Sequence, residues 1–284
     1  TSFTIAVSSC ALFSQETGDK GVAFPFVKAL IMVNQRLTEL VQAIDEQFVI
    51  VVIPTDSQDI VLLNNNITKH KLNVDRVCEI TGEKTLLYHL NEIKPVLYLS
   101  TNPENVRDGI NAGYGAATMI FPQKDYHEPS DEKLHVAFDG DGVLFSDESE
   151  RVFIEQKLDG FLANERKNED NPLEQGLLCK FLEALVHFQQ RFKKSKNASN
   201  AKCPIHTYLV TTRGTESDGI RALKTLKKRN LEINEAFLLN GANKGPVLKA
   251  IKPHIFFDDQ MRHIKGALEN GVIGAHVPYG VRNE

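Results

Sequence analysis

The strongest chemical signal in the sequence is a pair of carboxylates, one residue apart, at the end of an apolar segment. Asp139 and Asp141 follow Val136–Phe138 and alternate with Gly140 and Gly142. Ligands of parallel sheets bind beyond the carboxyl ends of the strands, so these acids are expected at a ligand site. One carboxylate there can attack phosphorus and hold Mg²⁺, while the other protonates the leaving oxygen. The glycines allow a tight turn that presents backbone N–H groups to a phosphate. The pattern therefore favours phosphoryl transfer.

Three further segments carry groups that suit the same chemistry. Each lies at the end of an apolar run or in a glycine-containing loop, and together they comprise Thr211, Thr212, Arg213, Lys244, Asp258 and Asp259. Hydroxyls and the guanidinium can donate to phosphate oxygens, and an ammonium stabilises a transferring phosphoryl group. Mg²⁺ prefers oxygen ligands and commonly binds one or two carboxylates beside water and phosphate. Asp139 and Asp258 meet that need, and Asp141 and Asp259 are the other acids of the predicted metal site.

Each of these segments also has a purely structural explanation. Asp-Gly pairs form turns, threonines and paired acids cap helices, and a lone lysine is usually solvated. Their joint occurrence in this order, each next to a strand or loop end, favours the chemical interpretation. The predicted catalytic residues are Asp139, Asp141, Thr211 and Lys244.

Selection of a substrate requires contacts beyond its phosphate. Phe145, Asp147 and Glu148 lie shortly after the acidic motif and are candidates for ribose or base contacts. Core packing is the alternative for Phe145. Arg213 can reach a substrate phosphate or pair with a nearby acid. The predicted phosphate contacts are Thr211, Thr212, Arg213 and Lys244.

Apolar runs typical of strands alternate with helix-periodic segments along the whole sequence. The expected strands are Thr4–Val7, Phe48–Ile53, Val96–Leu99, Leu134–Phe138, Thr207–Val210 and Ile255–Phe257. Apolar residues recur with a helical period between Leu30 and Ile44, and again between Leu178 and Phe192. This alternation is typical of parallel sheets covered by helices, so the expected fold class is α/β.

An internal repeat divides the sequence in two. Ile93–Ser100 resembles Ile251–Asp258 at an offset of 158 residues, the difference between 251 and 93. Any two strand–helix units share some similarity, but the same order of elements favours two related α/β halves, residues 1–130 and 131–284. The polar segment Gln123–Asp131 joins them. Residues 146–202 have no counterpart in the first half, and we expect a helical cap-like insertion there.

Composition and charge exclude several classes of protein. The 284 residues are 42% hydrophobic and 25% charged, and the longest apolar runs are too short to cross a membrane. A net charge of −4 provides no basic field for nucleic acid or anionic lipid. Four widely spaced cysteines fit a reducing compartment better than a zinc site or a disulfide framework. Thr1–Phe13 lacks the basic segment of a signal peptide, so we expect a cytoplasmic protein without nucleic-acid or membrane partners.

The acidic, hydroxyl and lysine segments resemble the four motifs of the haloacid dehalogenase (HAD) superfamily. Longer strings resemble the cytosolic 5′-nucleotidase type I family, namely Thr4–Ser9, Ala23–Leu30, Val136–Glu150, His254–Met261 and Ala275–Gly280. The resemblance covers essentially the whole chain. It implies a Rossmann-like HAD parallel sheet with a helical cap insertion, preceded by a degenerate α/β half of similar topology. It also implies Mg²⁺-dependent hydrolysis of nucleoside 5′-monophosphates, typically AMP, through an aspartyl-phosphate on Asp139.

The first half of the sequence lacks the acids of the second half. The positions that correspond to Asp139 and Asp141 fall within Val7–Cys10, and Ser100-Thr101 correspond to Asp258-Asp259. We therefore expect a non-catalytic half that packs on the catalytic one and helps to shape the nucleoside pocket. A nucleotide effector and a second copy of the chain stay open as partners.

Other functions fit the same motifs. One is a HAD phosphatase for another small phosphoester, such as a sugar phosphate, and another is a phosphotransferase that uses a nucleoside acceptor. From a different class, a nucleotide-binding regulator without turnover would share the fold, although retention of all four motifs argues against it.

Overall fold

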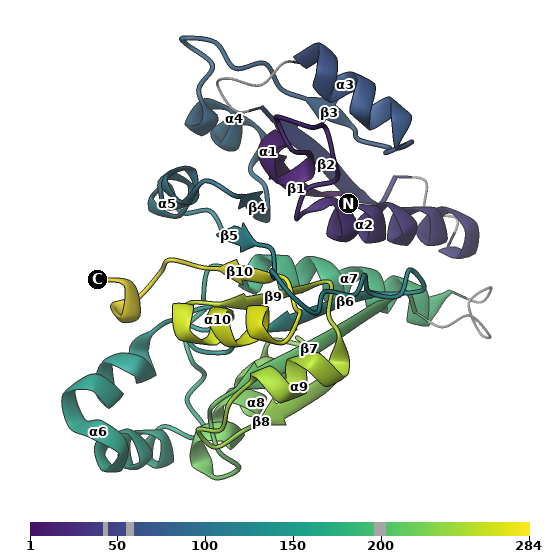
Figure 1. Ribbon diagram of the computed structural model, residues 1–284. Coiled ribbons are helices and arrows are strands. Elements are labelled where there is room, and N and C mark those ends of the chain that lie inside the picture. The colour runs from purple at the N-terminus through teal and green to yellow at the C-terminus, as the bar shows by residue number, and fades with distance from the viewer. Residues whose placement is uncertain (42–44, 55–59, 196–202) are drawn as a thin grey trace.

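The structure is built on one sheet of ten strands. The computed structural model describes residues 1–41, 45–54, 60–195 and 203–284, with the strand order β3-β2-β1-β4-β5-β10-β9-β6-β7-β8 (Figure 1). All neighbouring strands are parallel except β5 and β10, which are antiparallel. Helices cover both faces of the sheet. The α/β class is confirmed.

The six expected strands are all present, and four further ones complete the sheet. The strands are β1 Phe3–Ser8, β2 Phe48–Ile53, β3 Arg76–Val77, β4 Leu97–Ser100, β5 Ala116–Ile120, β6 Leu134–Phe138, β7 Ile205–Thr211, β8 Glu235–Leu238, β9 Ile255–Asp258 and β10 Gly274–His276. The additional strands are β3, β5, β8 and β10. They are short, partly exposed or rich in small residues, so they lack a strong strand pattern.

Both predicted helical stripes are present. The helices are α1 Ser9–Leu12, α2 Phe24–Arg36, α3 Ile60–Lys69, α4 Leu86–Ile93, α5 Pro103–Asn111, α6 Glu148–Lys167, α7 Cys179–Lys194, α8 Ser217–Lys228, α9 Gly245–Ile251 and α10 Met261–Glu269. The stripe from Leu30 continues from α2 into a π-helical turn, η1 Leu37–Val41, and its last member, Ile44, lies outside the described residues. A 3₁₀ turn, η3 Val281–Asn283, lies near the C-terminus.

The two halves of the sheet repeat the same strand order. The first half runs β3-β2-β1-β4-β5, and the second runs β8-β7-β6-β9-β10. The antiparallel pair β5–β10 joins the halves edge to edge, with Ala275 opposite Met119 (Figure 1). A single continuous sheet therefore carries both copies of the repeated arrangement.

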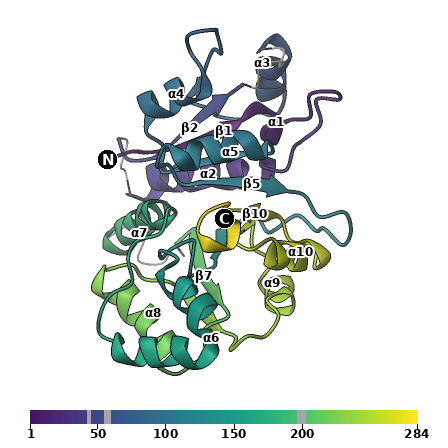
Figure 2. The same cartoon turned by 90° about the vertical axis from the view of Figure 1, so that its left-hand side faces the viewer.

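Three apolar clusters hold the layers together. The largest includes Phe26 of α2, Leu63 of α3, Phe181 of α7 and Ala222 of α8, so it spans both halves on one face of the sheet. On the opposite face, one cluster lies under α4 and α5 and another under α9 and α10. Figure 2 shows α9 and α10 across β7 from α7 and α8. Strands such as β2 are apolar throughout because both of their faces are covered.

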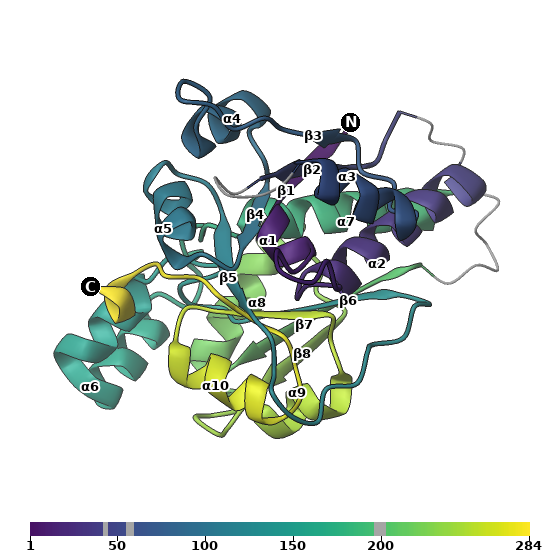
Figure 3. The same ribbon diagram turned by 45° about the horizontal axis from the view of Figure 1, so that its top comes forward.

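The stretch predicted as one insertion contains two helices with different surroundings. α7 is the crossover between β6 and β7, and nine of its residues are buried. α6 buries only Ser149 and Glu165, contacts α8, and projects at the edge of the molecule (Figure 3). Within the described part of this stretch, α6 alone resembles an added cap. No helix of the described residues is long and apolar enough to cross a membrane.

Candidate active site

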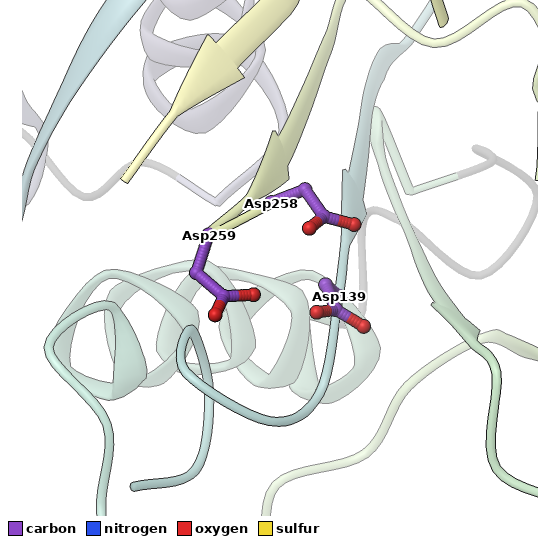
Figure 4. Close-up of side chains that lie close together, drawn as sticks. All are labelled: Asp139, Asp258 and Asp259. Atoms are coloured by element: carbon purple, nitrogen blue, oxygen red, sulfur yellow. The ribbon is translucent and has the colours of Figure 1, made fainter. Parts of the chain in front are cut away.

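The carboxyl ends of β6 and β9 bring three acids together. Phe138 pairs with Phe257 in the sheet, and the backbone N–H of Asp139 donates to the Phe257 carbonyl at 2.8 Å. Asp139 and Asp258 therefore lie side by side on neighbouring strands, with Asp259 next to them (Figure 4). All three side chains are buried. Asp139 and Asp258 are more than a hundred positions apart in the sequence, but they meet because neighbouring parallel strands end at the same edge of the sheet.

Lys244 lies between two of these acids. Its Nζ is 2.7 Å from Asp139 Oδ1 and 2.8 Å from Asp258 Oδ2. Asp258 also contacts His263 Nδ1 at 3.0 Å and accepts from the Gln260 N–H at 2.8 Å. Burial acts to lower the pKa of Lys244, but the two carboxylates outweigh it and raise that pKa, so the ammonium is charged. The site thus holds a fixed cation beside the predicted nucleophile.

The same acids form a group suited to a divalent cation. Asp139, Asp258 and Asp259 each offer an oxygen, and these atoms lie within 4.8 Å of one another. Both carboxylate oxygens of Asp259 are buried and have no hydrogen-bond partner among the described residues. Burial and the neighbouring acids raise the pKa of Asp259 and of Asp139. Burial also acts to raise the pKa of Asp258, but Lys244 and His263 outweigh it and lower that pKa.

Charge and ligand type both support this assignment. When all three acids are ionised, they and the one ammonium carry two excess negative charges, which one divalent cation would balance. An all-oxygen ligand set suits Mg²⁺. The unpartnered oxygens of Asp259 would gain a partner, which removes the cost of burying them alone.

Asp141 lies outside this group of acids. Its carboxylate accepts two hydrogen bonds from Arg213, from Nη2 to Oδ1 at 2.7 Å and from Nε to Oδ2 at 2.8 Å. This is the paired geometry that arginine forms with carboxylates. Gly142 has a φ of 78°, so the chain turns sharply after Asp141 as the glycine pattern predicts. The structure does not bring the Asp141 carboxylate to the cluster that it was predicted to join as a metal ligand.

Arg213 is almost fully buried and engaged with acids. Besides Asp141, it contacts Glu165 Oε2 at 2.7 Å and the Asp218 carbonyl at 2.8 Å through Nη1. The sequence left two roles open for Arg213, a contact with the substrate phosphate and pairing with a nearby acid. In the structure Arg213 pairs with the acids Asp141 and Glu165.

Thr211 is buried at the end of β7, next to β6 in the sheet. Its Oγ1 accepts a hydrogen bond from the Arg213 backbone N–H at 3.2 Å, and this contact does not use the hydroxyl hydrogen. Thr212 is partly exposed, and its carbonyl accepts from Gly241 in the loop that leads to Lys244. Both threonines therefore lie at the strand edge where the acids gather.

The three residues proposed for nucleoside contacts have internal partners. Phe145 is 1% exposed and belongs to the main apolar cluster, so the structure places it in the core. Asp147 Oδ2 accepts from the Val281 N–H at 2.8 Å and pairs with Arg151. Glu148 accepts from the Glu174 N–H at 2.7 Å. The structure does not bring these side chains to the acidic cluster.

Several residues of the site carry no signal in the sequence. Glu165 is fully buried between Arg213 and Arg221, although it belongs to a highly charged segment. His263 contacts Asp258, and His276 Nε2 lies 3.0 Å from the Asp259 carbonyl. The spacing of the histidines does not indicate these contacts, because each depends on a turn between β-strand and helix.

The first half carries hydroxyl and thiol groups at the equivalent strand ends. Val7 pairs with Leu99 as Phe138 pairs with Phe257, so Ser8 corresponds to Asp139 and Ser100 to Asp258. Cys10 Sγ accepts from Thr101 Oγ1 at 3.0 Å and lies 3.2 Å from Ser8 Oγ. In the described part of the first half, no three acids, histidines or cysteines form a comparable group.

Comparison with known proteins assigns the chain to a family. A family model described as 5′-nucleotidase matches residues 14–284. Human cytosolic 5′-nucleotidase 1B is 42% identical over 298 aligned positions, which cover 96% of this chain and 48% of the human protein. The chain thus spans about half the length of the curated relative that it matches. The resemblance to cytosolic 5′-nucleotidases of type I is confirmed, and the chain belongs to the 5′-nucleotidase family.

Proposed function

We propose that this protein hydrolyses nucleoside 5′-monophosphates, with AMP as the preferred substrate, in a Mg²⁺-dependent reaction through an aspartyl-phosphate on Asp139. The observation that carries the proposal is the buried arrangement of Asp139, Lys244 and Asp258 beside the unpartnered carboxylate of Asp259. Family membership supports a nucleotide substrate. The preference for AMP rests on the family resemblance alone.

The reaction divides into two displacements at phosphorus. In the first, a carboxylate oxygen of Asp139 forms a bond to phosphorus while the bond to the 5′ oxygen breaks, and Asp141 gives that oxygen its proton. In the second, Asp141 takes a proton from water as the water oxygen bonds to phosphorus and Asp139 is released. The products are a nucleoside and inorganic phosphate, and both aspartates return to their starting states.

Cations and hydroxyls stabilise the phosphoryl group during both steps. Lys244 lies next to Asp139 and supplies a fixed positive charge near the attacking oxygen. The hydroxyl of Thr211 is at the same edge of the sheet and can donate to a phosphoryl oxygen. Asp139, Asp258 and Asp259 would hold Mg²⁺, which supplies charge neutralisation to the phosphate when bound.

The first half has a non-catalytic role in this proposal. Its strand ends carry Ser8 and Ser100 in place of the acids. We assign it a structural role in the nucleoside site. Ser8→Ala and Ser100→Ala should leave kcat unchanged, and a change in KM or in activation by added nucleotides would identify these strand ends as a ligand site.

Phosphate release from a panel of monophosphates tests the function. The panel contains purine and pyrimidine nucleoside 5′-monophosphates, their 3′ isomers and sugar phosphates, each with Mg²⁺ and with excess EDTA. We expect release from the 5′-nucleotides, fastest with AMP, and loss of release in EDTA. Preference for a sugar phosphate, or product phosphorylation of an added nucleoside, would favour the alternative enzymes.

A substituted nucleophile separates catalysis from binding. Asp139→Asn removes the attacking carboxylate, and we expect kcat to fall by about 10³-fold or more, as in other enzymes that lose a nucleophile. Asp159→Asn changes an exposed aspartate of α6 and serves as the matched control. Wild-type protein that binds AMP without releasing phosphate would support the nucleotide-binding regulator instead.

A further inference from the structure

A buried carboxylate connects α6 to the chemical centre. Glu165 lies in the last part of α6 and is 0% exposed, whereas most of that helix faces solvent. Non-helical backbone at Lys157, with a φ of 59°, separates this part from the first turns of the helix. A charged side chain in such a position is costly unless it is fully paired.

Glu165 is paired on both of its oxygens. Oε2 lies 2.7 Å from Arg213 Nη1, and Oε1 lies 3.0 Å from Arg221 Nη1. Ser149 at the other end of α6 donates to Oε1 at 2.7 Å. Each contact is buried, so the two arginines and α6 are held in one hydrogen-bonded unit.

Arg213 extends this unit to Asp141. Its Nε and Nη2 bind both oxygens of Asp141, while its Nη1 binds Glu165. The Phe161 ring, one turn before Glu165, lies 5.6 Å from the centre of the guanidinium. The orientation of the Asp141 carboxylate therefore depends on the Arg213 guanidinium, and two residues of α6, Glu165 and Phe161, contact that guanidinium.

This arrangement creates a requirement for the reaction. Both oxygens of Asp141 are occupied by Arg213, yet proton transfer requires one of them to face the leaving oxygen of the substrate. When Asp141 releases one of these bonds, Glu165 still provides Arg213 with a second charged partner. Without it, Asp141 would be the sole acid bound to a buried guanidinium, and release would cost more.

We infer that Glu165 is a positioning residue for phosphoryl transfer, which holds Arg213 so that Asp141 can turn one oxygen toward the leaving group. The inference rests on the proposed function, because it assigns Asp141 the proton transfer to the 5′ oxygen. Glu165 itself does not touch the reacting atoms.

The test compares two substrates that differ in one atom. AMP has an alkoxide leaving group that needs a proton, whereas an AMP analogue with sulfur at the bridging 5′ position releases a thiolate without one. For Glu165→Gln we expect kcat/KM on AMP to fall about 10–100-fold and kcat/KM on the analogue to change less than about threefold, because kcat/KM reports the first displacement, in which only AMP needs the proton. KM for AMP should stay near the wild-type value. Glu155→Gln, an exposed glutamate of the same helix, is the matched control.

The ratio of the two rates makes the outcome independent of protein yield. Partial unfolding lowers both rates equally and leaves the ratio unchanged, so a changed ratio reports on positioning. If Glu165→Gln is insoluble, Glu165→Asp keeps the charge, shortens the reach and should show a smaller change of the ratio in the same direction. Equal losses on both substrates, or no loss, would overturn the inference. Wild-type protein inactive on both would instead overturn the proposed function.

Discussion

Asp259→Asn should make the metal-free protein more stable while it removes activity. Both oxygens of Asp259 are buried and have no hydrogen-bond partner within the described part of the chain, and two further carboxylates lie close by. An asparagine side chain has nearly the same shape but no charge, and its N–H groups can donate to Asp139 or Asp258. Burial and the neighbouring acids raise the pKa of Asp259, so without a cation the folded state must keep this acid protonated or bury its charge, and the substitution removes that cost. When a cation is bound, the substitution removes one of its ligands.

The size of the effect follows from burial. Leaving a buried polar group unsatisfied costs about 1–3 kcal/mol, and more when the group is charged. We expect Asp259→Asn to raise the free energy of unfolding in EDTA by about 1–3 kcal/mol for that reason. In the wild type, a cation at about 100 times its dissociation constant should add about 2.7 kcal/mol, and the variant should lose most of this gain.

Chemical denaturation in EDTA and in a Mg²⁺ series measures both quantities. The wild type should become more stable with rising Mg²⁺, and Asp259→Asn should start higher and respond weakly. Asp159→Asn, exposed on α6, should behave as the wild type in both series. A variant less stable than the wild type in EDTA, or one with the full Mg²⁺ response, would refute this account of the acidic cluster.

Three further predictions address other parts of the structure. Lys244→Met should lower kcat at least about 100-fold, as loss of one charge-stabilising donor does elsewhere, and a variant with near-wild-type turnover would contradict its placement beside the phosphoryl group. Phe145→Ala should cost about 3–5 kcal/mol of unfolding free energy as a core truncation, with KM unchanged for the folded enzyme; a raised KM would instead indicate a substrate contact. Burial, followed by the charge of neighbouring His135, lowers the pKa of His254 to about 4, and its Nδ1 accepts from the His135 N–H. The folded state therefore binds fewer protons than the unfolded one, and stability should fall as the pH drops from about 6.5 toward 4. His254→Asn, which keeps an acceptor, should flatten that dependence in urea titrations, and an unchanged slope would exclude His254 as its source.

The acidic motifs were predictable because each lies beside a strand with a strong apolar pattern. Asp139 and Asp258 follow runs that are buried on both faces, and parallel strand ends share an edge wherever the sheet forms. The alternation of elements indicated the α/β class for the same reason. By contrast, β5 and β10 contain mainly alanine, glycine and other weakly patterned residues, and their antiparallel pairing has no sequence signal.

The role of Glu165 and the placement of the residues that follow the acidic motif were not predictable. Glu165 stands in a charged segment, and charge density there indicates solvent exposure. Only the tertiary fold brings it against Arg213, which is 48 residues away. Phe145, Asp147 and Glu148 follow the catalytic motif closely in sequence, but sequence proximity does not determine which side chains turn inward to the core or toward the C-terminal segment.

The reversal of direction between β5 and β10 separates the two sets of strand ends in space. Because the strands of the first half run opposite to those of the second, Ser8 and Ser100 lie at the far rim of the sheet from Asp139 and Asp258. At the edge of the sheet that carries Asp139 and Asp258, the first half instead contributes the turn between α5 and β5. In this turn Gly115 approaches the Leu177 carbonyl. A ligand held at Ser8 and Ser100 would therefore influence turnover only by long-range communication across the strands, and direct contact with the nucleoside would fall to the α5–β5 turn.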